Sequence, residues 1–193
     1  MQDSDRELVH EAKKGNQTAF GKLVNHYYQM VYAIAYGVLN HSEAARDTAQ
    51  EVFLKVFREI SDFEQKSKFK TWLYRIAVNT AIDESRKRRP VESLDRPREN
   101  DPEKPAMTPR DYSPGPRDLA YQAELREVLK RALEELSPEH RAVMVLREFQ
   151  DLSYDEIAEM LQIEIGTVMS RLFYARKKLA EILSPKMGEA KKR

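Results

Sequence analysis

The chain has 193 residues, of which 41% are apolar, and its 33 basic and 32 acidic residues leave a net charge of +1. It contains no cysteine, which excludes disulfides, thiolate metal sites and cysteine nucleophiles, and its four histidines are scattered without metal-ligand spacing. No apolar run approaches the roughly 20 residues that span a bilayer and no secretory pattern opens the chain, so we expect a soluble, cytoplasmic protein without membrane insertion, metal or cofactor.

Residues 1–89 have the pattern of consecutive helices. The run Ser4-Asp5-Arg6-Glu7 has the spacing of a capping box and predicts a first short helix, which Gly15-Asn16 ends. Apolar residues at three-to-four spacing then predict a second helix ending near Asn40, a third over about 42–60 and a fourth over about 70–88. The residues expected to face the core are Phe20, Leu23, Val24, Tyr27, Val31, Ile34 and Val38, then Ala45, Val52, Phe53, Val56, Phe57 and Ile60, then Trp72, Leu73, Ile76, Ala77 and Ala81.

Residues 90–117 contain seven of the nine prolines and almost no apolar residue. Such a stretch cannot bury a core, so we expect an extended, flexible linker. It separates a first predicted domain, residues 1–89, from a second, residues 118–193.

The second domain is also expected to be helical, over about 118–135, 138–149, 154–161 and 165–183. Ser137 precedes a proline at a first helical position, and Ser153 and Glu156 have the spacing of a second capping box. No strand alternation is found in the sequence. The prediction is therefore an all-α fold of two small helical domains joined by a flexible proline-rich linker.

The last two predicted helices carry opposite charge. Residues 118–164 contain 5 basic and 12 acidic residues, whereas residues 165–193 contain 8 and 2. Two helices that share a small core across a three-residue turn form a helix-turn-helix, whose second helix enters the major groove of DNA. The charge reversal fits that use, because only the second helix has to meet phosphates. An ordinary helical hairpin with a solvated basic face is the alternative.

A second candidate for nucleic-acid binding is "SKFKTWLYRIAVNTAIDESRKRR" (67–89), which interleaves aromatic and basic residues. Rings stack on unpaired bases while cations follow the backbone, and stacking contributes about 1–3 kcal/mol per base. The alternative is that Trp72, Leu73 and Ile76 belong to the core and that the basic run 86–89 only favours a helix C-terminus.

Four segments resemble the extracytoplasmic-function (group 4) sigma factors of bacterial RNA polymerase: "GNQTAFGKLVNHYY" (15–28), "DTAQEVFLKVFREISDF" (47–63), "FKTWLYRIAVNTAIDESRKRR" (69–89) and "LSYDEIAEMLQIEIGTVMSRLFYARKKL" (152–179). The resemblance covers essentially the whole chain except the linker and the tail. It implies an alternative transcription initiation factor and not an enzyme. The protein would bind core RNA polymerase and promoter DNA, reading the minus-thirty-five element as duplex and melting the minus-ten element by capturing unstacked bases.

The resemblance also implies protein partners. Residues 47–55 of the third predicted helix would contact the clamp helices of the polymerase β′ subunit, with the β subunit as a further partner. An anti-sigma factor would cover these surfaces. The residues placed at the polymerase are Asp47, Gln50, Glu51, Leu54 and Lys55. The sequence departs from the family pattern at Arg46, where an acid is common, and at Thr48, where Leu or Ile is usual.

In the first domain, the resemblance assigns minus-ten binding to the loop and helix that follow residue 62. The candidates are Phe63, Ser67, Lys68, Phe69, Thr71, Trp72, Arg75, Asn79, Thr80, Asp83 and Arg86. An asparagine can pair bidentately with a base edge, and arginines hold phosphates, so Asn79, Arg75 and Arg86 have distinct expected roles.

In the second domain, the resemblance assigns minus-thirty-five binding to the last predicted helix. The candidates are Gly166, Thr167, Met169, Ser170, Arg171, Phe173, Tyr174, Arg176 and Lys177. Met169 and Tyr174 stand where the family usually has basic residues, so we expect more apolar contact with DNA, such as contact with thymine methyl groups.

Two other classes of protein remain as alternatives. A stand-alone helix-turn-helix regulator would bind its operator without polymerase, using its N-terminal helices to dimerise or to sense a signal. A helical enzyme is the second alternative, but the sequence shows no carboxylate pair, metal cluster or phosphate-binding glycine loop.

Overall fold

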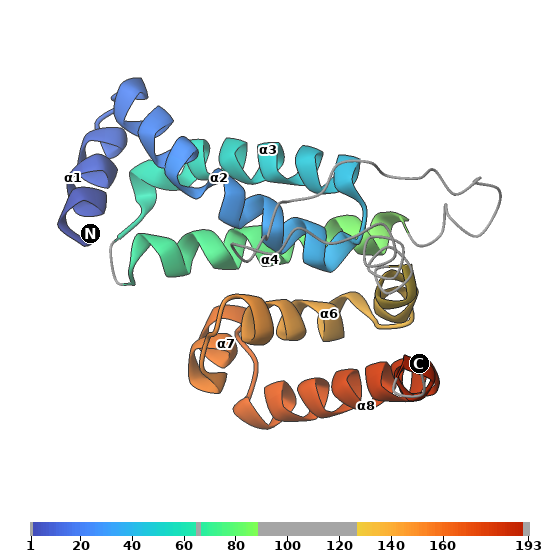
Figure 1. The fold of residues 1–193 in the computed structure, drawn as a ribbon. Helices are drawn as coiled ribbons and strands as arrows, with labels where there is room; N and C mark the ends of the chain where they lie inside the picture. Colours follow the sequence, from blue (N-terminus) through green and yellow to red (C-terminus); the bar gives the residue numbers. More distant parts are fainter. Residues whose placement is uncertain (1, 65–66, 89–126, 191–193) are drawn as a thin grey trace.

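The computed structural model describes residues 2–64, 67–88 and 127–190. All regular structure in these ranges is helical (Figure 1), which confirms the predicted all-α fold. The predicted linker, 90–117, and residues 118–126 of the predicted fifth helix lie outside the described residues.

The first helices form what we call the N-terminal layer: α1 (Gln2–Lys13), α2 (Gln17–Leu39), α3 (Ser42–Glu59), the 3-10 turn η1 (Ile60–Asp62) and α4 (Phe69–Arg88). Local capping fixes their ends. The Asn16 side chain accepts a hydrogen bond from the Ala19 amide at the start of α2, and His41 does the same for Ala44 at the start of α3. Helix α2 ends at Leu39, close to the predicted end near Asn40, and Asn40 caps it in the left-handed conformation.

The remaining helices form the C-terminal layer: a helical segment over 127–134, α6 (Pro138–Met144), the π-helical turn η2 (Val145–Phe149), α7 (Tyr154–Leu161) and α8 (Ile165–Ala190). Both predicted caps are confirmed. Ser137 caps α6 with Pro138 at the first position, and Ser153 and Glu156 form a complete capping box at α7.

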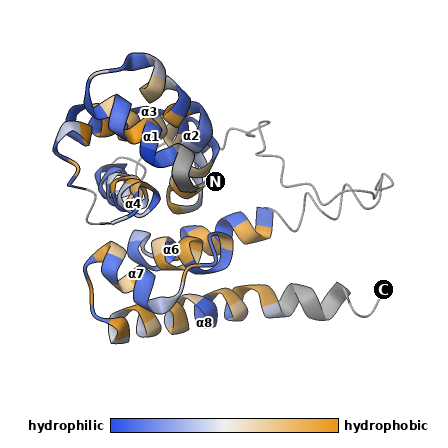
Figure 2. Cartoon of the chain, turned by 90° about the vertical axis from the view of Figure 1, so that its left-hand side faces the viewer, coloured by the Kyte–Doolittle hydropathy of each residue, from blue (hydrophilic) through white to orange (hydrophobic). Residues whose placement is uncertain are grey.

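The two layers pack against each other along a surface that we call the seam. Helix α4 lies between α2 and α3 on one side and α6 and α7 on the other, as Figure 1 shows. One hydrophobic cluster therefore continues from Leu23 and Val52 in the N-terminal layer to Leu146 and Leu172 in the C-terminal layer. Figure 2 shows hydrophobic residues distributed through the helices of both layers.

Four local predictions were wrong. Helix α1 begins at Gln2, so Ser4 lies inside its first turn, because the residues before the apparent capping box are also helical. Phe57 is 52% exposed, because it packs on Phe20 at the surface rather than in the core. The predicted helix over 138–149 widens into a π-helical turn at Val145, and α8 continues to Ala190 instead of ending near 183.

Candidate nucleic-acid interface

Helix α8 has one buried side and one strongly exposed apolar side. Val168, Leu172, Ala175 and Leu179 are buried at helical spacing, which fixes the rotation of the helix. On the outside, Met169, Phe173 and Tyr174 are 53%, 62% and 60% exposed, and the last two rings meet edge to face with centroids 5.6 Å apart. Large apolar side chains grouped in water mark a contact surface.

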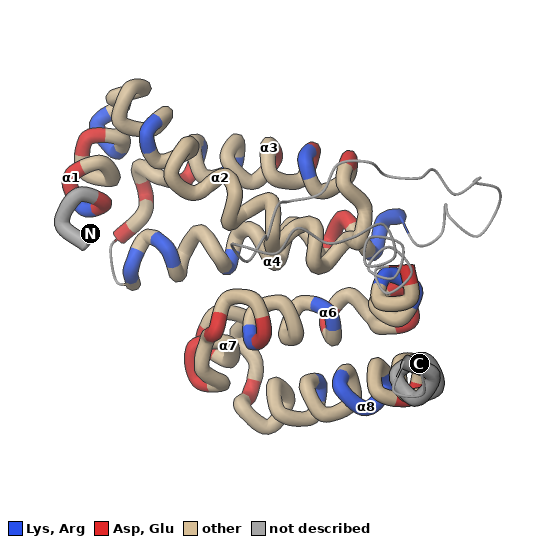
Figure 3. The backbone as a smooth tube through the Cα atoms, viewed as in Figure 1, with Lys and Arg blue, Asp and Glu red and all other residues tan. Residues whose placement is uncertain are grey.

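The turn between α7 and α8 has the geometry of a helix-turn-helix. Gln162 ends α7 in the left-handed conformation, with φ of 54°, so the chain reverses within three residues. Ile157 and Ala158 of α7 and Val168 and Leu172 of α8 are buried together in the core, and Leu161 and Ile163 are partly buried against them. Figure 3 shows acidic residues on α7 and basic residues on α8.

Several predicted minus-thirty-five residues are already engaged within the protein. Arg176 donates from Nη2 to Glu148 at 2.6 Å and from Nε at 3.2 Å, and hydrogen bonding to this partner raises the pKa of the guanidinium. The Ser170 hydroxyl donates to the Thr167 carbonyl at 3.0 Å. The exposed side of α8 also carries Gly166 and Lys177, next to the apolar residues Met169, Phe173 and Tyr174. Arg171 and Thr167 are half-buried beside the turn.

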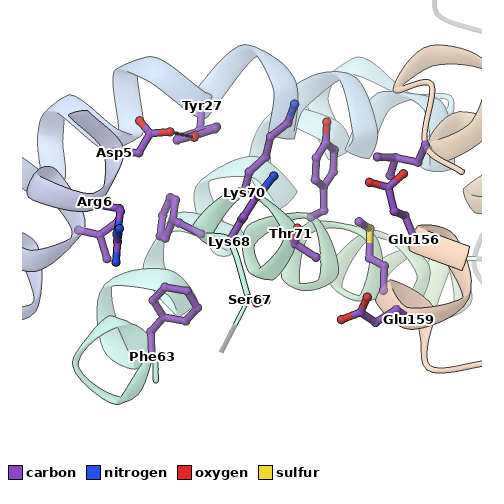
Figure 4. A pocket seen from close by; sticks show the side chains of 15 residues that line it. Asp5, Arg6, Tyr27, Phe63, Ser67, Lys68, Lys70, Thr71, Glu156 and Glu159 are labelled. Carbon is purple, nitrogen blue, oxygen red and sulfur yellow. Dashed lines mark hydrogen bonds between the residues drawn. The ribbon is translucent and has the colours of Figure 1, made fainter. Parts of the chain in front are cut away.

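The predicted minus-ten residues near the start of α4 line a cavity of about 810 Å³. Phe63, Ser67, Lys68, Phe69 and Thr71 contribute to its wall, so the structure brings these five candidates together. Lys68 and Lys70 give this part of the cavity positive charge, and the Lys70 ammonium lies 5.5 Å from the ring centre of Tyr74. Figure 4 shows these side chains around one space.

The two phenylalanines do not project from the surface. Phe63 and Phe69 are each 7% exposed and belong to an aromatic cluster with Tyr27 and Trp72, with centroids 4.8 Å apart for Phe63 and Trp72 and 5.5 Å apart for Tyr27 and Phe69. The Lys13 ammonium donates to the Phe63 carbonyl at 2.7 Å and fixes the backbone at this point. These rings therefore form a rigid wall.

The remaining minus-ten candidates lie along α4 with unequal access to solvent. Asn79 and Asp83 are exposed, and Trp72 and Arg75 are half-buried. Thr80 is only 4% exposed, and its hydroxyl accepts a hydrogen bond from Lys55 at 3.1 Å, so it supports α3 rather than presenting itself to a ligand. Arg86 donates to Glu139 of α6 at 2.6 Å.

Two further parts of the cavity wall were not predicted from the sequence. Asp5, Arg6 and Val9 of α1 line it, and so do Glu156 and Glu159 of α7 from the other layer. Both sets come from helices distant in sequence from α4, so no local motif links them to it. Glu156 and Glu159 of α7 therefore line the same cavity as Lys68 and Lys70 at the start of α4, as Figure 4 shows.

Specific polar contacts hold the seam together. The Tyr74 hydroxyl donates to Gln150 at 2.7 Å, and Arg141 donates to the Ser85 hydroxyl at 3.1 Å. Burial raises the pKa of Tyr74 to about 12. Burial also opposes ionisation of Glu139, but hydrogen bonds from Arg86, from its own backbone amide and from Ser137 outweigh it and lower the pKa of Glu139 to about 2.

Helix α3 presents a different surface. Asp47, Gln50 and Leu54 are exposed, while Glu51 and Lys55 are half-buried and form an ion pair at 3.1 Å. Next to them is a groove of about 550 Å³, which the sequence did not predict. Phe20, Tyr28, Leu54 and Phe57 line it, and its apolar character suits a protein partner.

Known proteins are similar to this chain in sequence and architecture. Residues 23–91 match the Sigma-70 region 2 family and residues 126–179 match the Sigma-70 region 4 family. RNA polymerase sigma-H factor of Pseudomonas aeruginosa is 33% identical, over 98% of each chain, and the ECF RNA polymerase sigma factor SigW of Bacillus subtilis is 34% identical, over 92% of this chain and 96% of that one. The chain belongs to the ECF family of RNA polymerase sigma factors.

Solved sigma-factor structures agree with this membership. CnrH, solved in complex with the cytosolic domain of CnrY, has 27% identity and a TM-score of 0.67, covering 95% of this chain and 99% of its own. The sigma factor RpoE of Bartonella quintana, solved with the anti-sigma factor NepR, has 25% identity and a TM-score of 0.61, covering 86% and 96%.

The membership decides between the classes that the sequence left open. Sigma factors are transcription initiation factors that direct RNA polymerase to promoters, so this protein is neither an enzyme nor a stand-alone regulator. Within the described residues, no helix is both long and apolar enough to cross a membrane. The region 2 match begins at residue 23, so α1 of this sigma factor lies outside it.

Proposed function

We propose that this sigma factor binds core RNA polymerase through α3, reads the minus-thirty-five element as duplex through α8, and melts the minus-ten element by capturing unpaired bases in the cavity beside α4. Promoter DNA and the polymerase β′ clamp helices and β subunit are its partners, in the cytoplasm. The observation that carries the proposal is that the chain has two surfaces of different shape: an exposed apolar face on a recognition helix and a walled cavity with Lys68 and Lys70 at the start of α4.

The exposed face of α8 suits duplex DNA. Met169 and Tyr174 stand where the family usually has basic residues, and Phe173 is exposed beside them. Apolar side chains in the major groove contact thymine methyl groups. Arg171, Arg176 and Lys177 would hold phosphates on either side. The expected minus-thirty-five sequence is therefore richer in thymine contacts than in guanine contacts.

The cavity beside α4 suits an unpaired base. A base removed from the stack loses a few kcal/mol, which stacking on an aromatic wall and contacts with fixed cations can offset. Phe63 and Phe69 give a rigid wall, Lys68 and Lys70 give the charge, and Asn79 lies further along the same helix with its amide exposed.

Promoter opening requires the two layers to move apart. Glu156 and Glu159 of α7 lie at the cavity, and Arg86 is held by Glu139, so the closed packing excludes DNA phosphates from part of the minus-ten surface. Core polymerase would separate the layers by binding each of them, and the linker would permit the separation. The relatives CnrH and RpoE were solved with protein partners, and we propose an anti-sigma factor as a further partner for this chain.

Run-off transcription on genomic fragments tests the proposal. Full-length protein with core polymerase should give transcripts that core polymerase alone does not give. Phe173→Ala should weaken binding to duplex carrying the minus-thirty-five element, and Lys68→Ala with Asn79→Ala should reduce opening while leaving that binding intact. Failure to co-migrate with core polymerase, or opening unaffected by the α4 substitutions, would overturn it.

A further inference from the structure

The cavity beside α4 has a wall that the proposed function does not use. Asp5 and Arg6 of α1 line it opposite the start of α4, as Figure 4 shows. This wall is part of the N-terminal layer, so it stays with the cavity when the C-terminal layer moves away. It also lies before residue 23, where the match to the region 2 family begins.

The carboxylate of Asp5 is held in one orientation. The Tyr27 hydroxyl donates to its Oδ2 atom at 2.6 Å, and Tyr27 is itself buried against Phe69 with ring centroids 5.5 Å apart. Burial and the hydrogen bond to Asp5 raise the pKa of Tyr27, so the phenol remains a donor at neutral pH. Among the described residues, no other side chain donates to this carboxylate, and Asp5 is part of the cavity wall. Its second oxygen can therefore still accept a hydrogen bond.

We propose that Asp5 accepts a hydrogen bond from the exocyclic amino group of the base captured in this cavity, an inference that rests on the proposed function. An ionised carboxylate only accepts, so it favours a base that presents an amino group and disfavours thymine, which has none. Arg6, Lys68 and Lys70 compensate the carboxylate charge and receive the phosphates on either side of the base. Tyr27 acts as a positioning residue through Asp5.

Atomic substitution in the DNA tests this contact. The probe is a fork-junction promoter fragment, recovered by run-off transcription with the wild-type holoenzyme, whose unpaired non-template bases are replaced one at a time by analogues that lack the amino group. Purine replaces adenine, and pyrimidinone replaces cytosine. With wild-type holoenzyme, one position should lose about tenfold in affinity, the size expected for a hydrogen bond to a charged group.

Variants of Asp5 then locate the acceptor. In Asp5→Asn, the amide oxygen can still accept from Tyr27 while its amino group faces the cavity, so removal of the base amino group should no longer weaken binding. Glu7→Gln is the matched control, because Glu7 is an exposed carboxylate on the same helix and is not part of the cavity wall. Tyr27→Phe should reduce the tenfold effect without abolishing it.

The outcomes separate this inference from the proposed function. If Asp5→Asn retains the full penalty for the missing amino group, or if wild type shows no penalty at any position, Asp5 does not read the base. If Lys68→Ala in the cavity wall also leaves fork binding unchanged, the cavity itself is not the minus-ten site. Thermal unfolding and co-migration with core polymerase should match wild type for Asp5→Asn, so that a folding defect is recognised.

Discussion

The cavity beside α4 and the exposed face of α8 both contain aromatic side chains, but these rings are buried at the cavity and exposed on α8. Phe63 and Phe69 are 7% exposed and locked in a cluster, whereas Phe173 is 62% exposed beside Tyr174. A duplex is a large, fixed object that a protruding face can enter. A single unpaired base is small and needs a surface already shaped around it, since ordering both partners at once would cost too much conformational entropy.

The largest expected effect comes from making the same substitution in both regions. Phe69→Ala should lower the free energy of unfolding by about 3–5 kcal/mol, because it removes a buried ring from the cavity wall. Phe173→Ala should change it by less than about 0.5 kcal/mol, because its ring lies in water. Urea unfolding of the full-length protein measures both changes. Similar decreases in the free energy of unfolding for the two variants would show that Phe69 is not more buried than Phe173.

The second prediction concerns the seam, which brings α7 to the cavity. A Cβ atom added at Gly37 would collide with Val145 of η2, while one added at Gly21 in the same helix meets nothing within 4 Å. Gly37→Ala should therefore lower the free energy of unfolding by about 1–2 kcal/mol through overpacking. Gly21→Ala should raise it by about 0.5–1 kcal/mol, since alanine is the better helix former. Equal stability of the two variants would mean that the layers do not pack this way in solution.

The same two regions differ in how well the sequence predicts them. The face of α8 follows from local spacing, because one side of that helix packs and the other meets solvent. The periodicity of Val168, Leu172, Ala175 and Leu179 therefore identifies the exposed side, and the caps at Ser137 and Ser153 are equally local.

The apolar spacing predicts the exposed side of helix α4 less well, because helices of both layers pack against it. Leu73, Ala77 and Ala81 are buried as expected, but Tyr74, Val78 and Ser85 on other sides of the helix are buried too, so no single apolar stripe exists. Thr80 was expected at DNA but is buried, and its hydroxyl accepts a hydrogen bond from Lys55 of α3. The walls contributed by α1 and α7 depend on contacts between distant segments, which spacing along the chain does not encode.

The third prediction concerns the ion pair between Glu148 and Arg176, which we expect to reduce the affinity of α8 for duplex DNA. Glu148→Gln removes the charge that pairs with Arg176 and should raise affinity for duplex carrying the minus-thirty-five element about two- to threefold, because an exposed pair contributes about 0–1 kcal/mol. The salt dependence should steepen by about one phosphate contact. Arg176→Ala is the control and should remove the gain when combined with Glu148→Gln. Unchanged affinity and salt dependence in Glu148→Gln would show that Arg176 does not meet phosphate.

The smallest expected effect is a pH dependence confined to the C-terminal layer. Burial lowers the pKa of His140, the nearby Arg171 lowers it further and Glu139 opposes them, while the Ser137 hydroxyl lies 2.6 Å from Nδ1. Because the folded pKa is below the unfolded value of 6.5, the contribution to stability is complete above that pH and is lost as the pH falls below it. Urea midpoints at about pH 7.5 and about pH 5.5 should therefore differ more in wild type than in His140→Gln, since only wild type gains a proton on unfolding at this site. An equal difference in the two proteins would mean that His140 titrates normally and that the packing of α6 against Arg171 is looser than the structure shows.

No comparable pH dependence is expected at the cavity wall, because Tyr27 and Tyr74 both have raised pKa values and stay protonated over this range.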